Sequence, residues 1–330
     1  MHEGIRVLQY GLGPIGSAIA RYVSQKPSLQ LVGGVDIDPK KIGKDLGAVI
    51  GLDSPMNMPV FKSLSDALSK VNADVVIHST SSYFPLFMEQ ILEILDTGLD
   101  IVSTAEELSF PWIANPEEAA KIDAAAKMAG KTVLGTGVNP GFLMDSLVLN
   151  MTAICQRVDH IAVTRRMNAS FRRGPFQAKI GTGMTVDAFN AKMAEGRMGH
   201  VGLPQSIGMV FDTLGKKLVR YESSVEPVVA DKPVKTDFFD VLPGKVRGLK
   251  QVAHGYTEKG EFICLTFIAA LDEPDDQDTI VIKGVPNLEV TLHGTNGDIA
   301  TVAIAGNAVR RVKEAAPGLV TMRDLPIVTN

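Results

Sequence analysis

Apolar runs alternate with amphipathic helical patterns through the first 140 residues of the chain. Strands are predicted over 5–10, 29–36, 74–78, 99–103 and 132–135, and helices over 15–24, 64–70, 85–96 and 116–129. Such alternation is typical of βαβ units, which build a parallel sheet with helices on both faces. The pattern therefore predicts an α/β fold that begins with a Rossmann dinucleotide-binding domain over 1–140.

After Gly141 the pattern changes to helices followed by long strands. Helices are expected over 142–154, 185–194 and 204–214, and strands over 158–165, 219–229, 246–256, 261–271, 278–283 and 288–293. Helices followed by strands predict an α+β domain over 141–297, which we expect to bind substrate and to form a homodimer through its sheet. A last helix over 298–315 is expected to pack on the first domain, so that 298–330 completes it.

A glycine-rich turn follows the first strand directly. Its residues are Gly11, Leu12, Gly13, Pro14, Ile15 and Gly16. In such a turn the first glycine permits the tight bend, the second lets a pyrophosphate approach the backbone, and the third allows the helix to pack closely. The first amides of the helix over 15–24 then face the anion. With a strand before it and a helix after it, the turn predicts a dinucleotide site.

The second strand ends at Asp36, 20 residues beyond Gly16. A carboxylate at this distance accepts hydrogen bonds from a ribose 2′-hydroxyl and repels a 2′-phosphate, which favours NAD. Lys40 and Lys41 follow closely, and a lysine here would neutralise that phosphate unless the pair only forms a solvated helix start. Use of NAD, of NADP or of both remains open.

Ligands of an open parallel sheet bind beyond the carboxyl ends of its strands. The residues that follow the later strands are therefore candidates for cofactor contact: Ser79, Thr80, Ser81, Thr104 and Asn139.

Glu106 and Glu107 stand just after the strand over 99–103, where the nicotinamide is expected. A carboxylate there would act as general acid or base beside a hydride transfer. Acidic residues are also favoured at helix N-termini by the helix dipole, which would be a purely structural role. Because adjacent side chains point apart, only one of the two is expected to face the substrate.

The segment 165–173 carries four arginines and follows a strand of the second domain. Arginine presents a fork of donors, so Arg166, with Asn168 beside it, is a candidate for binding polar substrate groups, and Phe142 is a candidate for the apolar part. The alternative is a solvated basic loop. The stretch 174–183 is expected to be a glycine-rich loop over the cleft.

Composition limits the partners, the metal sites and the compartment that are expected for this chain. The chain has 330 residues, 45% hydrophobic and 21% charged, with a formal net charge of −4, so a nucleic-acid partner is not expected. Two cysteines, Cys155 and Cys264, lie in apolar stretches and are expected to be reduced core residues. The histidines, for which a structural role is expected, and the carboxylates show no metal-ligand spacing, so no metal site is predicted. With no signal sequence and no membrane-spanning run, a cytoplasmic protein is expected.

Six segments together resemble the group that contains 2,4-diaminopentanoate dehydrogenase and the native amine dehydrogenases, which is distantly similar to dihydrodipicolinate reductase. The segments are 10–16, 103–111, 137–145, 165–170, 199–204 and 297–301, and the resemblance runs over nearly the whole chain.

The resemblance implies reversible oxidative deamination of a primary amine to a ketone or aldehyde plus ammonia, with hydride passing to NAD(P). It places the catalytic glutamate in the pair Glu106 and Glu107, of which Glu106 is preferred. The His-His-x-x-Lys-x-Asp signature of dihydrodipicolinate reductase is absent. An imine reductase of that type remains the alternative enzyme, and a non-catalytic protein that senses the dinucleotide remains the alternative outside enzymes.

Overall fold

The fold of residues 4–196, 198–274 and 276–330 is described by a computed structural model. The chain divides into two units, one formed by 1–142 with 297–330 and the other by 143–296. The expected helix over 298–315 is α10 (Gly297–Glu314), and it belongs to the first unit.

The first unit is built on a seven-stranded sheet in the order β15-β6-β5-β4-β1-β2-β3, in which every neighbouring pair is parallel. Its strands are β1 (Ile5–Tyr10), β2 (Leu29–Val35), β3 (Val60–Phe61), β4 (Val75–His78), β5 (Asp100–Ser103), β6 (Thr132–Gly135) and β15 (Gly318–Val320). From β1 the chain runs outward to β2 and β3, and from β4 it runs the other way. The order therefore reverses between β1 and β4, and a crevice beyond their carboxyl ends is where such sheets bind ligands.

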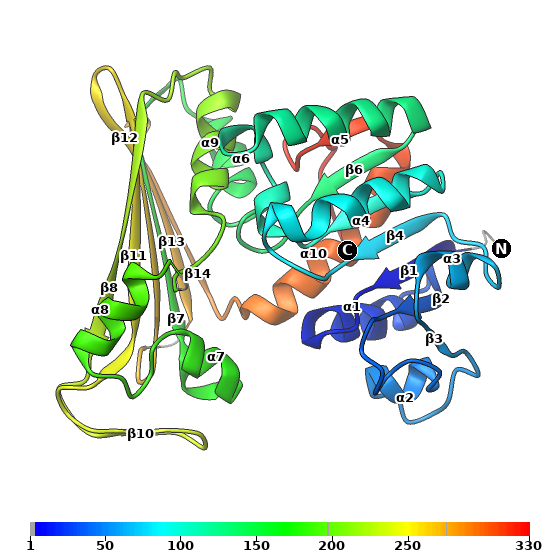
Figure 1. Ribbon diagram of the computed structural model, residues 1–330. Coiled ribbons are helices and arrows are strands. Elements are labelled where there is room, and N and C mark those ends of the chain that lie inside the picture. The colour runs from blue at the N-terminus through cyan, green and yellow to red at the C-terminus, as the bar shows by residue number, and fades with distance from the viewer. Residues whose placement is uncertain (1–3, 197, 275) are drawn as a thin grey trace. The chain divides into compact units, whose positions relative to one another are not determined.

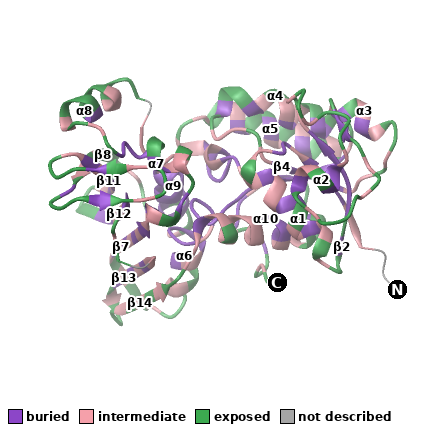
Figure 2. Ribbon diagram, turned by 90° about the horizontal axis from the view of Figure 1, so that it is seen from below, coloured by how far each residue is buried: buried purple, intermediate pink, exposed green. Residues whose placement is uncertain are grey.

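Helices cover both faces of this sheet (Figure 1). One core contains residues of α1 (Pro14–Gln25) and α10, and the other contains residues of α3 (Leu64–Leu68), α4 (Phe84–Asp96) and α5 (Pro116–Ala129). Every residue of β4, β5 and β6 is buried, as the purple of β4 in Figure 2 illustrates, because helices lie on both sides. The Rossmann fold expected from the sequence is confirmed.

The second unit contains a six-stranded sheet in the order β14-β13-β7-β12-β11-β8. Its strands are β7 (Arg157–Asn168), β8 (Arg220–Val229), β11 (Val246–Thr257), β12 (Gly260–Ala270), β13 (Gln277–Val285) and β14 (Leu288–His293). Only β7 and β12 pair in parallel, and the other pairs are antiparallel. Alternate side chains of β7, from Ile161 on, are buried in one core with α6 (Ser146–Thr152) and α9 (Leu203–Thr213).

Several expectations about the second unit were wrong in detail. The helix expected over 142–154 is shorter, because the Asp145 carboxylate accepts a hydrogen bond from the Ser146 N–H and α6 begins only there. The expected loop over 174–183 begins with a short helix, α7 (Gly174–Lys179), which Pro175 helps to start. Cys155 and Cys264 are free but only half-buried, so neither is a core residue.

In the first unit, the short elements α2 (Leu46–Ile50) and β3 were not predicted. They carry too few residues to show a hydrophobic period.

Candidate active site

The glycine turn takes a sharp bend at the end of β1. Gly11 has a φ of +90°, and a Cβ on it would lie 2.5 Å from the carbonyl oxygen of Ser79. A Cβ on Gly16 would lie 1.9 Å from the carbonyl oxygen of Gly11. Both positions therefore require glycine for packing within the protein. The residues Leu12, Pro14 and Ile15 complete the turn and the start of α1.

Gly13 differs from the other two glycines. It stands at the N-cap of α1 with ordinary extended angles, and a Cβ placed on it would meet no atom within 4 Å. No side chain caps the first turn of α1, so its leading amides point toward the same open space. This combination of open space and amide donors fits a dinucleotide pyrophosphate.

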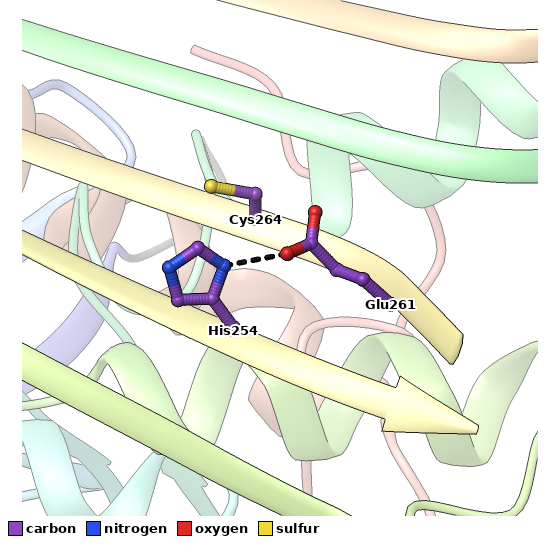
Figure 3. Close-up of side chains that lie close together, drawn as sticks. All are labelled: His254, Glu261 and Cys264. Carbon is purple, nitrogen blue, oxygen red and sulfur yellow. Dashed lines mark hydrogen bonds and ion pairs between the residues drawn. The ribbon is translucent and has the colours of Figure 1, made fainter. Parts of the chain in front are cut away.

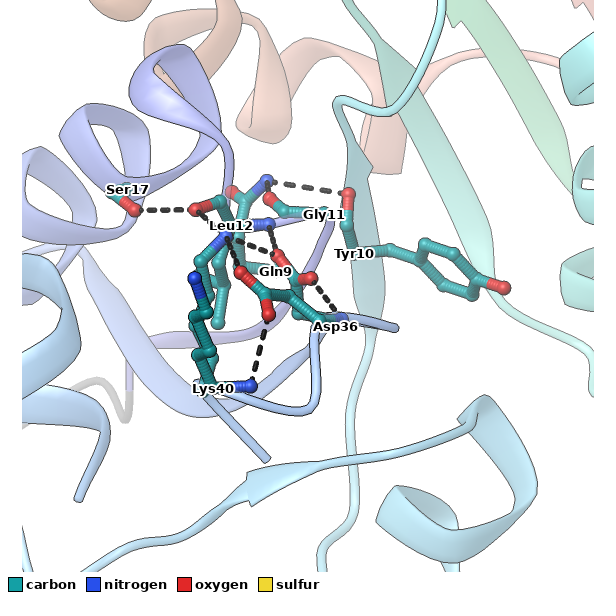
Figure 4. Close-up of polar contacts among 9 residues, drawn as sticks. Gln9, Tyr10, Gly11, Leu12, Ser17, Asp36 and Lys40 are labelled. Carbon is teal, nitrogen blue, oxygen red and sulfur yellow. Dashed lines mark hydrogen bonds and ion pairs between the residues drawn. The ribbon is translucent and has the colours of Figure 1, made fainter. Parts of the chain in front are cut away.

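Asp36 lies beside the turn, and its carboxylate contacts three hydrogen-bond donors (Figure 4). Its carboxylate accepts hydrogen bonds from the Leu12 N–H at 2.8 Å and the Asp38 N–H at 2.8 Å. The Lys41 ammonium lies 3.0 Å from the same carboxylate and 2.9 Å from the Leu12 carbonyl oxygen. Partial burial opposes ionisation, but these hydrogen bonds outweigh it and lower the pKa of Asp36. Lys41 therefore stands at the end of β2, directly beside the expected ribose acceptor.

Gln9 is a supporting residue that the sequence analysis did not single out. It is fully buried within β1, and its side-chain amide donates to the Gly11 carbonyl oxygen at 3.0 Å, as Figure 4 shows. An amide directly after the apolar residues Val7 and Leu8 of a buried strand is the signal that could have identified it, because buried polar groups need specific partners.

The ends of β4 and β5 carry a buried polar network around His78. The ring contacts Ser103 Oγ at 2.9 Å through Nδ1 and Gln90 Oε1 at 2.8 Å through Nε2. Thr80 Oγ1 lies 2.9 Å from the same Nε2. Burial lowers the pKa of His78 to about 4, so the ring is neutral near pH 7. The network fixes the strand ends from which the cofactor candidates extend.

The other cofactor candidates occupy the ends of their strands. Ser79 Oγ is buried and has no hydrogen-bond partner among the described residues, which fits a hydroxyl that would hydrogen-bond to a bound ligand. Ser81 begins the turn into α4, and its hydroxyl accepts from the Tyr83 N–H. The Thr104 N–H donates to the His78 carbonyl oxygen. Asn139 is buried beyond β6 and precedes the cis peptide bond to Pro140.

Glu106 and Glu107 follow β5 in a short 3-10 turn, η1 (Glu106–Leu108). The Glu107 carboxylate accepts a hydrogen bond from the Phe84 N–H at 2.6 Å, at the first residue of α4. The Glu107 N–H in turn donates to the Ser82 carbonyl oxygen. Both glutamates are half-buried. Glu107 is thus a capping residue for α4. Glu106 stays the candidate for proton transfer that the resemblance prefers.

The arginine segment of the second unit is not a solvated loop. Arg165 and Arg166 lie within β7, and Arg165 is only 2% exposed. Its guanidinium lies 3.7 Å from Asp278, which is equally buried, and donates to the Thr295 carbonyl oxygen. Burial raises the pKa of Asp278, although Arg165 opposes this shift. Arg165 therefore forms part of the interior of the unit.

The two polar substrate candidates of the second unit have contacts within it. Arg166 lies 3.7 Å from Glu273, and the Asn168 side-chain amide donates to the Glu273 carbonyl oxygen at 2.7 Å. The Asn168 oxygen accepts from the Ser170 N–H. These contacts join the end of β7 to Glu273, in the connection from β12 to β13. Phe142 is the half-buried last residue of the 1–142 segment of the first unit. Substrate contact by the three residues stays a prediction.

His200 is anchored to the inner face of the second sheet. Its N–H donates to Gln251 Oε1 at 2.6 Å, and its ring stacks on Phe267 with 4.6 Å between centroids. Gln251 is nearly buried in β11, on the same face as Leu249 and Ala253. A polar residue in a buried position of an alternating strand is the sequence signal for such an anchor, and it was missed.

Comparison with known proteins identifies the family. The profile of the 2,4-diaminopentanoate dehydrogenase C-terminal domain matches residues 142–330, and that of the dihydrodipicolinate reductase N-terminus matches residues 5–105. A 2,4-diaminopentanoate dehydrogenase from Acetoanaerobium sticklandii is 34% identical over 98% of this chain and 94% of its own length.

The chain belongs to the 2,4-diaminopentanoate dehydrogenase family. An amine dehydrogenase from Streptomyces virginiae is 23% identical over 98% of this chain and 96% of its own length. The solved amine dehydrogenase from Mycobacterium smegmatis has the same fold, with a TM-score of 0.88, 24% identity, and coverage of 100% of this chain and 98% of that one. The resemblance found in the sequence is confirmed, and the protein is an NAD(P)-dependent oxidoreductase of the amine dehydrogenase type.

The similarity to dihydrodipicolinate reductase is narrower. A 4-hydroxy-tetrahydrodipicolinate reductase from a Synechocystis strain matches 48% of this chain and 55% of its own length, at 26% identity. The matching profile is that of the N-terminus of that enzyme and covers residues 5–105, whereas residues 142–330 match the 2,4-diaminopentanoate dehydrogenase C-terminal domain. The likeness is therefore that of the nucleotide-binding half, which disfavours the alternative of an imine reductase of that type.

Proposed function

We propose that this protein catalyses the reversible oxidative deamination of a primary amine, with Glu106 as the proton-transfer residue. The observation that carries the assignment is the position of the glutamate pair in the turn directly after β5, and the 2.6 Å hydrogen bond from the Phe84 N–H gives Glu107 a structural role as a cap of α4. Glu106 stands in the same turn after β5, at the edge of the sheet where ligands of this fold bind.

In the direction of amination, ammonia adds to the carbonyl carbon and water leaves, which gives an iminium ion. The Glu106 carboxylate would accept a proton from the incoming ammonium and return it to the departing hydroxyl. A dinucleotide held at the glycine turn would supply the hydride that reduces the iminium carbon. In the opposite direction the amine loses hydride, water adds to the iminium carbon, and ammonia leaves. Proton transfer by one carboxylate serves both directions, as microscopic reversibility requires.

The residues at the end of β2 support use of both NAD and NADP. Asp36 offers an acceptor for a ribose 2′-hydroxyl, whereas Lys41, 3.0 Å from it, offers a cation for a 2′-phosphate. Because Lys41 already neutralises Asp36, the repulsion that normally excludes NADP is reduced. The side-chain exposures of 27% for Lys41 and 10% for Asp36 leave the lysine the more mobile partner.

The decisive experiment measures oxidation of NADH and NADPH by the purified protein with a panel of ketones and aldehydes, with and without ammonium. Turnover that requires both the carbonyl compound and ammonium is the expected result. Turnover of a preformed cyclic imine without ammonium would instead favour an imine reductase. Cofactor binding with no turnover on the whole panel would favour a dinucleotide sensor.

We also propose a homodimer that forms through the six-stranded sheet of the second unit. One face of that sheet is covered by α6 and α9, and among the described residues no helix contributes to a core on the other face. Light scattering coupled to gel filtration tests this, with a mass of twice 35.3 kDa expected. A single-chain mass at micromolar concentration would contradict it.

We place the protein in the cytoplasm, where its small-molecule substrates and ammonia would be available. No helix in the described part of the chain is long and apolar enough to cross a membrane. Cell fractionation followed by detection of the protein tests the placement, and recovery in the membrane fraction would contradict it.

A further inference from the structure

Three neighbouring strands of the second unit bring nitrogen, oxygen and sulfur donors together on one face of the sheet. His160 lies on β7, His254 on β11, and Glu261 and Cys264 on β12. Figure 3 shows His254, Glu261 and Cys264 close together on β11 and β12, with His254 hydrogen-bonded to Glu261. The side chains lie on the face opposite to the core that contains Ile263 and Ala253.

The donor atoms of this cluster are close to one another. His254 Nδ1 lies 2.7 Å from one oxygen of Glu261, and His160 Nε2 lies 2.8 Å from the other. The ligand atoms of His254, Glu261 and Cys264 all lie within 4.8 Å of one another. Ligand bonds to zinc are about 2.0–2.3 Å long, so small rotations of these side chains would bring all three donors onto one ion.

A β-bulge makes this arrangement possible. In a regular strand Glu261 and Cys264 would point to opposite faces, because side chains alternate and the two residues are three apart. The pairing shifts between Gly255 and Tyr256, which oppose Ile263 and Glu261, so Phe262 is the extra residue. Phe262 points into the core against Phe211, and Glu261 consequently shares the outer face with Cys264. Cys264 lies directly opposite His254 in the ladder.

In the single chain the cluster is accessible from solvent, and it lies on the sheet face through which we propose that the homodimer forms. Glu261 is exposed, and His254 and Cys264 are half-buried. The second oxygen of Glu261 remains in contact with His160, which would orient the carboxylate in the way that outer partners orient metal ligands. All the donors come from one chain, so no residue of a second copy is required.

We propose that His254, Glu261 and Cys264 bind one zinc ion, with His160 positioning Glu261. A set of one imidazole, one carboxylate and one thiolate suits zinc and disfavours calcium and magnesium, which prefer oxygen alone. On binding, the Cys264 thiol releases its proton to the solvent, and His254 keeps its ring proton on Nε2 while Nδ1 donates its electron pair. A water molecule completes a tetrahedral site. No electron transfer is involved.

The chain's motif spacing could not indicate this site. Its ligands come from two strands joined by a hairpin, and their convergence depends on the bulge and on strand register. The site lies in the second unit, whereas the glycine turn belongs to the first, so the proposal does not depend on the proposed reaction.

The test is a zinc titration of the full-length protein after dialysis against a chelator, in competition with a chromophoric chelator. One zinc ion per chain is expected. Cys264→Ser and Glu261→Gln should each weaken binding by more than His160→Gln, for which we expect a loss of roughly 10–100-fold, as for an outer partner. Cys155→Ser is the matched control, because Cys155 lies after α6 and should leave zinc affinity unchanged.

Cobalt provides a second, spectroscopic readout. Binding of Co²⁺ through a thiolate produces a sulfur-to-metal charge-transfer band in the near ultraviolet, which Cys264→Ser should remove and Cys155→Ser should keep. Circular dichroism confirms that each variant is folded. Absence of stoichiometric zinc binding would overturn the proposal. So would wild-type affinity in Cys264→Ser, or loss of the cobalt band in Cys155→Ser. In each of these three cases, His160, Glu261 and His254 would form a hydrogen-bonded group without the proposed metal.

Discussion

The glycine turn of the first unit and the buried polar residues of the second differ in how their positions are encoded. In the turn, six consecutive residues place the backbone. Gly16 is explained by a contact with Gly11, and Gly11 by its positive φ and by a contact with Ser79 at the end of the adjacent strand β4. In the second unit, Arg165 meets Asp278 only because β7 and β13 pair in register, and His200 meets Gln251 only because a distant loop packs on β11. Local motifs are therefore readable in a sequence, whereas side chains joined across a sheet are not.

The largest expected effect tests the local character of the turn. Gly13→Val should abolish binding of NADH, because the new side chain fills the space open above the turn, while its extended angles permit valine without strain. Titration of NADH fluorescence measures binding, and thermal melting measures stability. The control is Gly16→Ala, which should lower the melting temperature as well, since its Cβ would overlap the Gly11 carbonyl oxygen. Near wild-type binding by the valine variant would show that the turn is only structural.

Replacing Glu106 tests whether one residue of an adjacent pair carries the chemistry. Glu106→Gln should reduce turnover by roughly 10²–10⁴-fold, the range for a lost general acid–base, with little change in cofactor affinity. Glu107→Gln is the matched control and should have a mild effect on turnover, because its amide oxygen can still accept from the Phe84 N–H. The measurement is ammonium-dependent NADH oxidation. The reverse ranking would assign the role to Glu107, and full activity in both variants would remove the pair from the mechanism.

The buried pair of the second unit provides the opposite test. Asp278→Asn should destabilise the protein by about 3 kcal/mol, because it leaves the Arg165 guanidinium buried without its counter-charge. Urea denaturation measures the loss. Glu314→Gln, which removes the exposed partner of Arg310 and Arg311 on α10, should have little effect on stability. Equal effects of the two variants would mean that the buried pair of Arg165 and Asp278 does not stabilise the protein more than an exposed pair.

The His78 network predicts a pH dependence of stability. The pKa of the buried ring is about 4, compared with 6.5 for an ordinary histidine, so the unfolded state binds the proton first. Stability should be full above pH 6.5 and should fall as the pH drops toward 4, by about 3 kcal/mol in total at 1.36 kcal/mol per pKa unit. Urea denaturation at several pH values measures the slope. A His78→Asn variant that keeps the same slope would assign it to other groups.

The smallest effect concerns the choice of cofactor. Asp36→Ala should weaken NADH binding roughly tenfold, the loss of a charged hydrogen bond of about 1.5 kcal/mol, and should improve the relative use of NADPH. Asp36→Ala also leaves the Leu12 N–H without its acceptor. Asp36→Asn keeps an acceptor oxygen, so it should perturb the turn less and serves as the comparison. Lys41→Met should weaken NADPH alone. Michaelis constants for both cofactors measure the outcome, and unchanged values in all three variants would contradict the assignment.

The sequence alone was sufficient for features that depend on near neighbours. Apolar patterns predicted the six strands of the second sheet and five of the seven strands of the first, but not the short strands β3 and β15. The spacing of Gly11, Gly13, Gly16 and Asp36 predicted the dinucleotide turn, because backbone geometry at a strand-to-helix turn is set largely by adjacent residues. Segments spread over nearly the whole chain also sufficed to identify the family.

Only the tertiary structure revealed the capping role of Glu107, since the donor is the Phe84 N–H, 23 residues earlier in the chain. It also placed Arg165 in the interior instead of a basic loop, because the burial of a strand residue depends on what packs against its face. The cluster of His254, Glu261 and Cys264 likewise exists only through strand register and one bulge. Side chains far apart in sequence meet through long-range pairing, and a pattern of residue types does not encode that pairing residue by residue.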